Sequence, residues 1–81
     1  MMDRKILQAI IMDKKSLYKT NKLSRRIVIE TAELFNLEPM EMVKILESIG
    51  VAKSGSVDWF KENGGITKKH VQQAKQMPLI F

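Results

Sequence analysis

Residues 24–50 of the chain read SRRIVIETAELFNLEPMEMVKILESIG, and this stretch decides the fold. Its apolar residues recur at three- and four-residue spacing, which is the periodicity of helices that bury one face. Ser24 is a suitable N-cap, Pro39 suits the first position of a helix, and Gly50 suits the position after its end. The stretch therefore predicts two helices joined by a turn at residues 36–38.

Three further helices are expected around this pair. One covers residues 3–19, where apolar residues again follow a helical stripe. Ser56 is expected to cap a short fourth helix that ends at residues 63–65, and Thr67 to cap a fifth helix through Lys75. The predicted fold class is all-α: a compact bundle of four to five short helices with an extended C-terminal tail.

The expected core consists of the apolar stripes of the first three helices. Its members are Ile6, Leu7, Ile10, Ile11, Leu17, Tyr18, Ile27, Val28, Thr31, Ala32, Leu34, Phe35, Met40, Val43, Leu46 and Ile49. Trp59, Phe60 and the six methionines are also assigned to packing, because flexible methionine fills irregular gaps in small cores. We expect no ligand at these side chains.

The composition is that of a small globular protein. Its 81 residues are 44% hydrophobic and 28% charged, which suits one domain with a modest core. No apolar run reaches membrane-spanning length, and the N-terminus lacks the pattern of a signal peptide. We expect a soluble, cytoplasmic protein with no membrane partner.

The sequence offers little for catalysis or cofactor binding. The absence of cysteine excludes disulfides, thiolate metal sites and a cysteine nucleophile. His70 is the only histidine, so a metal site would lack a second ligand, and we expect an exposed helix residue. Nothing arranges serine, histidine and aspartate as nucleophile, base and orienter. We therefore expect a non-enzymatic protein that uses no metal or cofactor.

The last six residues, Gln76-Met77-Pro78-Leu79-Ile80-Phe81, form a separate segment. Pro78 lacks a backbone N–H and disfavours helix at the residue before it, so the fifth helix should stop near Gln76. Spaced apolar anchors on an extended, free C-terminus are typical of a docking peptide. We therefore divide the chain into a helical domain, residues 1–75, and a docking peptide, residues 76–81.

This peptide resembles the motif with which bacterial proteins bind the DNA polymerase sliding clamp. The hexapeptide form of that motif has Gln first, an apolar residue second, Leu fourth and Phe or Leu sixth, and the matching residues are Gln76, Met77, Leu79 and Phe81. The resemblance implies that Leu79 and Phe81 fill an apolar pocket of the clamp while Gln76 fixes the register. It implies an adaptor or regulator of bacterial or phage DNA replication. The competing interpretation is a hydrophobic tail that packs back on the core.

The net charge of +5 is distributed unevenly. Residues 1–26 carry a net charge of +6, residues 27–62 carry −4, and residues 63–81 carry +3. Basic side chains near both ends are therefore candidates for contacts with DNA phosphates. These candidates are Arg4, Lys5, Lys14, Lys15, Lys19, Lys22, Arg25, Arg26, Lys68 and Lys69. The competing interpretation is a set of solvated lysines.

The central pair of helices also resembles the helix-turn-helix family of DNA-binding proteins. The matching apolar, small, turn and core positions are Val28, Ala32, Asn36, Leu37, Met42 and Ile45. That family places its second helix in the major groove, where three acidic residues would surround Lys44 and repel the phosphates. The alternative function is a small DNA-binding transcription regulator, and the competing interpretation is a structural hairpin.

Two loops have weaker resemblances to anion sites. Residues 46–60 resemble the helix-hairpin-helix family, whose Gly-apolar-Gly hairpin presents backbone N–H groups to a phosphate. Gly50 and Val51 fit that pattern, but Ala52 replaces the second glycine. Residues 64–69 put amides, a hydroxyl and two lysines at a helix start. In both cases the competing interpretation is an ordinary helix end.

Overall fold

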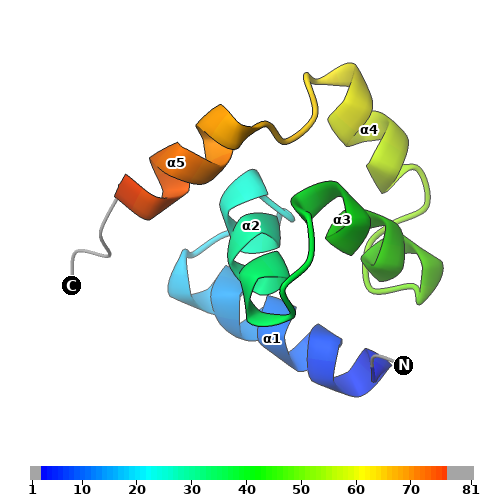
Figure 1. Cartoon of the computed structure of the whole chain (residues 1–81). Helices are drawn as coiled ribbons and strands as arrows, with labels where there is room; N and C mark the ends of the chain where they lie inside the picture. The colour runs from blue at the N-terminus through cyan, green and yellow to red at the C-terminus, as the bar shows by residue number, and fades with distance from the viewer. Residues whose placement is uncertain (1–2, 77–81) are drawn as a thin grey trace.

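A computed structural model of the chain describes residues 3–76 (Figure 1). The described residues form five helices: α1 (Arg4–Leu17), α2 (Arg25–Leu34), α3 (Pro39–Ser48), α4 (Ser56–Glu62) and α5 (Lys68–Gln76). The predicted all-α class is confirmed, and each helix begins and ends within about two residues of its expected bounds. No helix of the described part is long and apolar enough to cross a membrane.

Helix α2 is the centre of the arrangement. It contacts α1, α3 and α5, while α4 packs against α3. In Figure 1, α1, α2 and α3 form a close group, and α4 and α5 follow one another along its outer side. The radius of gyration is 12.0 Å, close to the value of about 11–12 Å that this chain length predicts for one compact unit.

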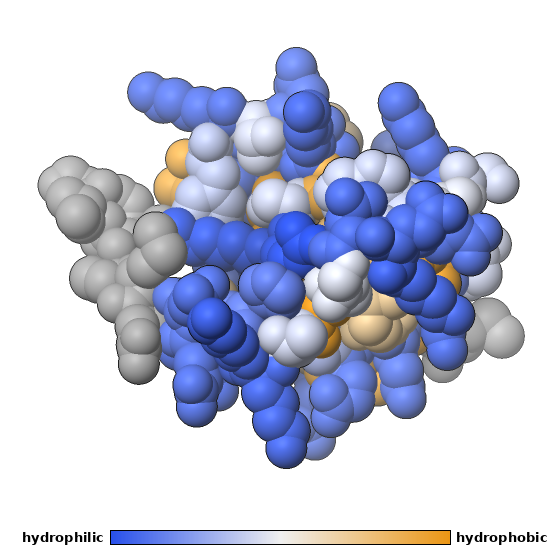
Figure 2. Space-filling view, turned by 90° about the horizontal axis from the view of Figure 1, so that it is seen from above, coloured by the Kyte–Doolittle hydropathy of each residue, from blue (hydrophilic) through white to orange (hydrophobic). Residues whose placement is uncertain are grey.

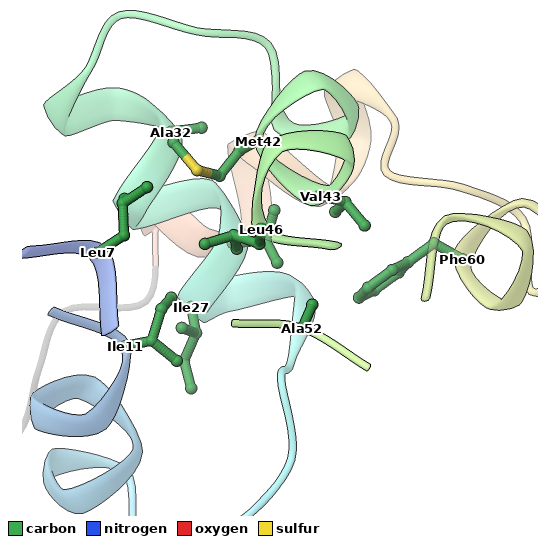
Figure 3. Packing of buried hydrophobic residues seen from close by; sticks show 10 residues of the cluster. Leu7, Ile11, Ile27, Ala32, Met42, Val43, Leu46, Ala52 and Phe60 are labelled. Atoms are coloured by element: carbon green, nitrogen blue, oxygen red, sulfur yellow. The ribbon is translucent and has the colours of Figure 1, made fainter. Parts of the chain in front are cut away.

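The hydrophobic core lies where α1, α2 and α3 meet (Figure 3). Leu7 and Ile11 point from α1 toward α2, and Met42 of α3 points toward Ala32. Each large apolar side chain in this cluster stabilises the fold by about 1.5–3 kcal/mol through burial. Thr31 is the buried polar residue of α2, and its hydroxyl donates to the Ile27 carbonyl at 2.7 Å, so burial leaves it satisfied.

Some side chains that we expected in the core are exposed instead. These are Ile6 at 55%, Met12 at 61%, Leu17 at 46%, Leu34 at 64% and Trp59 at 53% exposure. Conversely, Ile29 was not expected in the core but is only 2% exposed. It lines a hollow together with Val71, because α5 lies against this side of α2. Packing of α5 therefore buries a second face of α2 that its main apolar stripe does not include.

The first three helices begin as their sequences indicate. The Asp3 side chain accepts the Lys5 N–H at 2.8 Å at the start of α1. The Ser24 hydroxyl accepts the Ile27 N–H at 3.3 Å at the start of α2, and Pro39 is the first residue of α3. The predicted roles of Ser24 and Pro39 are therefore confirmed.

The expected cap of α4 is wrong by one residue. Gly55, with φ of 90°, occupies the N-cap position, and Ser56 is the first helical residue. The Ser56 hydroxyl donates back to the Lys53 carbonyl at 2.5 Å. This local bond stabilises the turn instead of capping the helix, which is the common alternative use of a serine beside a helix start.

Candidate functional site

The predicted clamp-binding peptide begins at the last residue of α5. The helix carries the described chain to Gln76, and Met77, Leu79 and Phe81 lie outside the described residues. Near its end, Lys75 forms an ion pair with Glu33 of α2 at 3.3 Å. The proposed peptide is therefore attached to a helix that packs on α2.

Two of the candidate DNA contacts belong to an internal charge cluster around Glu30. The Lys14 ammonium lies 2.9 Å from one carboxylate oxygen, and the Arg26 Nε lies 3.2 Å from the other. The Tyr18 hydroxyl also donates to this carboxylate, and the Arg26 guanidinium lies over the Tyr18 ring at 4.5 Å from its centroid. The cluster joins α1 to α2, so Lys14 and Arg26 have a structural role.

Electrostatics inside this cluster shift two pKa values. Burial acts to raise the pKa of the Glu30 carboxyl, but hydrogen bonds from Lys14 and Tyr18 and the positive charge of Lys14 outweigh it and hold the pKa below its ordinary value. Burial and the Glu30 carboxylate raise the pKa of the Tyr18 hydroxyl. The favoured state therefore has an ionised Glu30 that accepts from a neutral Tyr18.

Arg25, a third candidate DNA contact, also has a structural role. Its Nε donates to the Gly65 carbonyl at 3.0 Å and its Nη2 to the Asn63 carbonyl at 2.5 Å. Its guanidinium also lies 5.8 Å from the centroid of the Phe60 ring. Arg25 thus ties the start of α2 to the loop between α4 and α5.

The other candidate DNA contacts are distributed over three parts of the fold. Arg4 and Lys5 lie in the first turn of α1, Lys15 in its last turn, and Lys19 and Lys22 in the loop that follows. Lys68 and Lys69 begin α5. Of these residues, Lys15 and Lys22 line one groove, and the structure adds Lys53 to them.

This groove has a volume of about 410 Å³. It lies between the end of α1, the loop before α2, the loop before α4, and α4 itself. The residues that line it are Lys15, Asn21, Lys22, Leu23, Val51, Ala52, Lys53, Ser56, Trp59 and Phe60. We call it the Trp59 groove.

The Trp59 groove combines an aromatic surface with positive charge. Trp59 is half exposed, whereas Phe60 beside it is 2% exposed and belongs to the core. The two rings meet edge to face, with centroids 5.1 Å apart and planes at 90°. Three of the groove residues are lysines, and none of the described residues that line it is acidic.

Sequence reasoning assigned both Trp59 and Phe60 to packing and therefore missed this groove. Successive residues of a helix point about 100° apart, so two adjacent aromatic residues on a short helix do not both face the same core. That spacing was the available signal that one ring faces outward. Lys15 and Lys22 line the same groove as Trp59 only because of the tertiary fold, so no local pattern in the sequence indicates it.

The turn between α2 and α3, where the sequence resembles the helix-turn-helix family, contains a residue in the left-handed conformation. Asn36 has φ of 56°, and the Leu37 N–H donates to the Ala32 carbonyl at 2.9 Å. Val28, Ala32 and Met42 are buried, and Ile45 is partly buried. However, the acidic residues Glu38 and Glu41 on or beside α3 are exposed.

Internal hydrogen bonds occupy backbone amides in both candidate anion loops. The Val51 and Ala52 N–H groups both donate to the Leu46 carbonyl at 2.9 Å. The Gly65 N–H donates to the Phe60 carbonyl at 2.6 Å, so it closes the end of α4. These donors are directed at carbonyls of the preceding helix, as in an ordinary helix C-cap.

His70 is partly buried, whereas we expected it to be exposed. Its Nδ1 accepts the Thr67 N–H at 3.0 Å, three residues earlier in the chain. This bond is one half of a capping box, in which a side chain in the first turn accepts the N–H of the residue before the helix. Among residues 3–76 there is no group of three His, Cys, Asp or Glu side chains that suits a metal ion.

Comparisons of the chain with protein-family models, with curated proteins and with solved structures found no match. Function is therefore inferred from the residues themselves.

Proposed function

We propose that this protein is a non-enzymatic adaptor or regulator of bacterial or phage DNA replication. It docks on the sliding clamp of the DNA polymerase through residues 76–81 and acts in the cytoplasm. The observation that carries the proposal is the order of Gln76, Met77, Leu79 and Phe81, which matches all four defining positions of the clamp-binding hexapeptide.

The position of this peptide supports the proposal. The core cluster is built from α1 to α4 and the loop before α4, and none of the residues from Lys68 to Lys75 of α5 is fully buried. The peptide thus begins at the periphery of the folded body. In Figure 2, the surface seen from above is mostly hydrophilic, with hydrophobic groups in small, separate places. A short segment with its own apolar anchors would not need an apolar patch on this face.

Docking would follow the usual energetics of peptide recognition. A few buried anchors carry most of the binding energy, and the neighbouring contacts mainly exclude water. Leu79 and Phe81 are the proposed anchors, and the amide of Gln76 fixes the register by hydrogen bonds. The body of the protein, with its basic residues, would then be held near DNA that passes through the clamp.

The direct test is binding of the full-length protein to a purified bacterial sliding clamp. Leu79→Ala/Phe81→Ala should weaken binding by about 30-fold or more, as expected for loss of hot-spot anchors. Ile80→Ala is the matched control, because it removes an apolar side chain from the same segment at a position that the motif does not define. Circular dichroism checks that the variants remain folded. Absence of wild-type binding to clamps from several bacterial hosts would contradict the proposal.

Recruitment to the clamp and inhibition of other clamp users require the same peptide contacts. A replication assay with purified clamp and polymerase separates them. Dose-dependent inhibition that disappears in Leu79→Ala/Phe81→Ala indicates a competitor. Unchanged synthesis with stable clamp binding indicates a recruited adaptor.

A second candidate function is DNA reading by the α2–α3 hairpin, as in a small transcription regulator. The left-handed conformation of Asn36 favours it, because this is the turn position at which the helix-turn-helix family needs such a residue. The exposed Glu38 and Glu41 oppose it. This function predicts sequence-specific duplex binding that survives removal of residues 76–81 and is lost in Lys44→Glu.

A further inference from the structure

We infer that the Trp59 groove is a binding site for single-stranded nucleic acid, in which a base stacks on Trp59 and phosphates contact Lys15, Lys22 and Lys53. The inference deepens the DNA-binding part of the proposed function by naming its site and the form of the ligand. It does not depend on the clamp peptide, because all groove residues lie between positions 15 and 60.

The tryptophan ring lies in a position that suits stacking. Trp59 is 53% exposed beside a buried Phe60, although tryptophan gains much from burial. Its helix is held firmly: the Glu47 carboxylate accepts the Val57 N–H at 2.9 Å, and Phe60 inserts into the core. The ring is therefore presented by an anchored helix, so little conformational entropy is lost when a flat ligand stacks on it.

The groove also carries uncompensated positive charge. Lys15, Lys22 and Lys53 come from three different segments and meet at one groove, and none of them has a carboxylate partner within the described residues. Lys14, by contrast, is neutralised by Glu30 at 2.9 Å. The charge of Lys14 is thus compensated, whereas the charge of its sequence neighbour Lys15 is not, and the groove remains cationic. An anionic ligand is the complementary partner.

The combination of an aromatic ring and lysines favours one kind of anion. A single strand of nucleic acid repeats a flat base and a phosphate along its length, which matches an exposed aromatic ring surrounded by lysines. In a duplex the bases are stacked on each other and their faces are hidden from a side chain such as Trp59. The groove volume of about 410 Å³ lies within the range of about 300–1,000 Å³ typical of small-molecule pockets, so a base has room to enter.

The test uses the full-length protein and its own fluorescence. Trp59 is the only tryptophan of the chain, so quenching of its emission by a short oligothymidylate reports stacking at this ring. We expect saturable quenching at low salt, with an oligouridylate of the same length showing whether RNA also binds. Contacts from three lysines predict that log K falls with log salt with a slope of about −2.

Variants locate the site, with binding followed by anisotropy of a labelled oligonucleotide. Trp59→Ala should weaken binding by about 5- to 150-fold, the usual effect of losing one stacked base, whereas Trp59→Phe should retain most of the affinity. Lys53→Ala should weaken binding and make it less dependent on salt. Lys61→Ala is the matched control, because it removes the same charge from α4 outside the groove and should have little effect.

Three outcomes would overturn the inference. One is the absence of binding to any single strand at low salt. Another is equal binding of duplex and single strand without quenching of Trp59, which would indicate phosphate contacts elsewhere. The third is quenching by an acidic peptide but not by an oligonucleotide, which would indicate a protein partner. Leu79→Ala/Phe81→Ala should bind the oligonucleotide normally, so failure of the clamp proposal and failure of this inference are distinguishable.

Discussion

The Lys14 ammonium lies 2.9 Å from the Glu30 carboxylate and so links α1 to α2 across a half-buried surface. The pair is part of a cluster in which Tyr18 donates to the same carboxylate. Glu30 therefore acts as a shared acceptor for side chains from two helices. Two of its partners, Lys14 and Arg26, were candidates for DNA contacts in the sequence, but in the fold they pair with Glu30 instead.

Replacing Glu30 with Gln should destabilise the protein by about 1–3 kcal/mol, because Lys14 would lose its counter-ion at a half-buried position. Urea unfolding followed by circular dichroism measures the change. Glu33→Gln is the matched control on the same helix, since Glu33 pairs with Lys75 at an exposed site and should lose less than about 1 kcal/mol. Equal losses in the two variants would contradict a structural role for the cluster.

The stability contributed by Glu30 should depend on pH. Because the folded state lowers the pKa of this carboxyl from its ordinary value of 4.5, the contribution is present above that value and is lost as pH falls below it through the lowered pKa. The unfolding free energies of wild type and Glu30→Gln should therefore converge in acid. The raised pKa of Tyr18 has the opposite sign, so its contribution is lost as pH rises above 10. A constant difference between the two proteins from neutral pH into strong acid would count against this assignment.

Arg25→Lys should destabilise the protein by about 1–2 kcal/mol although it preserves the charge. Lysine lacks the planar fork with which Arg25 reaches the carbonyls of both Asn63 and Gly65. Hydrogen exchange should also quicken at the Gly65 amide, which closes α4. If Arg25 served mainly as a phosphate contact, this substitution would leave stability and exchange unchanged.

Lys19→Gly should stabilise the protein by up to about 1 kcal/mol. Lys19 has φ of 52°, a conformation that costs an ordinary side chain about 1–2 kcal/mol and glycine almost nothing. The greater freedom of glycine in the unfolded chain offsets part of this gain. Lys15→Gly, inside α1, is the control with the opposite sign and should cost about 1 kcal/mol. Thermal unfolding of both variants checks the difference.

His70→Ala should loosen the start of α5 by about 0.5–1 kcal/mol through loss of a capping bond. Because a backbone amide only donates, the bond from the Thr67 N–H requires an Nδ1 without a proton. His70→Gln keeps an acceptor three residues after Thr67 and should retain most of the protection. Hydrogen exchange of the α5 amides compares the variants, and equal loss in both would rule out the cap.

The helices were predictable because their signals are local. Asn36, Pro39 and Ser24 act through their own backbone conformation or nearest amides, and they occupy the expected positions. Periodicity also identified Leu7, Ile11, Ile27, Val28, Val43 and Leu46 as buried, but it gave the partly buried Met40 in place of Met42, which is fully buried. It failed for Leu34, which lies at the last turn of α2 and is 64% exposed, since spacing gives the direction of a side chain but not the extent of the neighbouring helices.

The candidate sites also differ in whether their signal is local in the sequence or depends on the tertiary fold. The hexapeptide at residues 76–81 is a linear pattern and was found from sequence alone. The Trp59 groove depends on the approach of Lys15, Lys22 and Lys53 from three segments, so only the folded chain brings it together. The sequence also could not show which basic residues form internal ion pairs, because a pair such as Lys14 with Glu30 depends on which helices become neighbours.

Helix α5 is more weakly attached to the core than the other long helices. From Lys68 to Lys75 it has no fully buried residue, and its exposed ion pair to Glu33 adds little holding strength. A pull applied beyond Gln76 would peel this helix from α2 before it disturbed the shared core of α1, α2 and α3. Its nine residues measure about 14 Å as a helix and about 30 Å when drawn out. The distance between the folded body and whatever holds its end could therefore grow by about 16 Å while the core of α1, α2 and α3 stays packed.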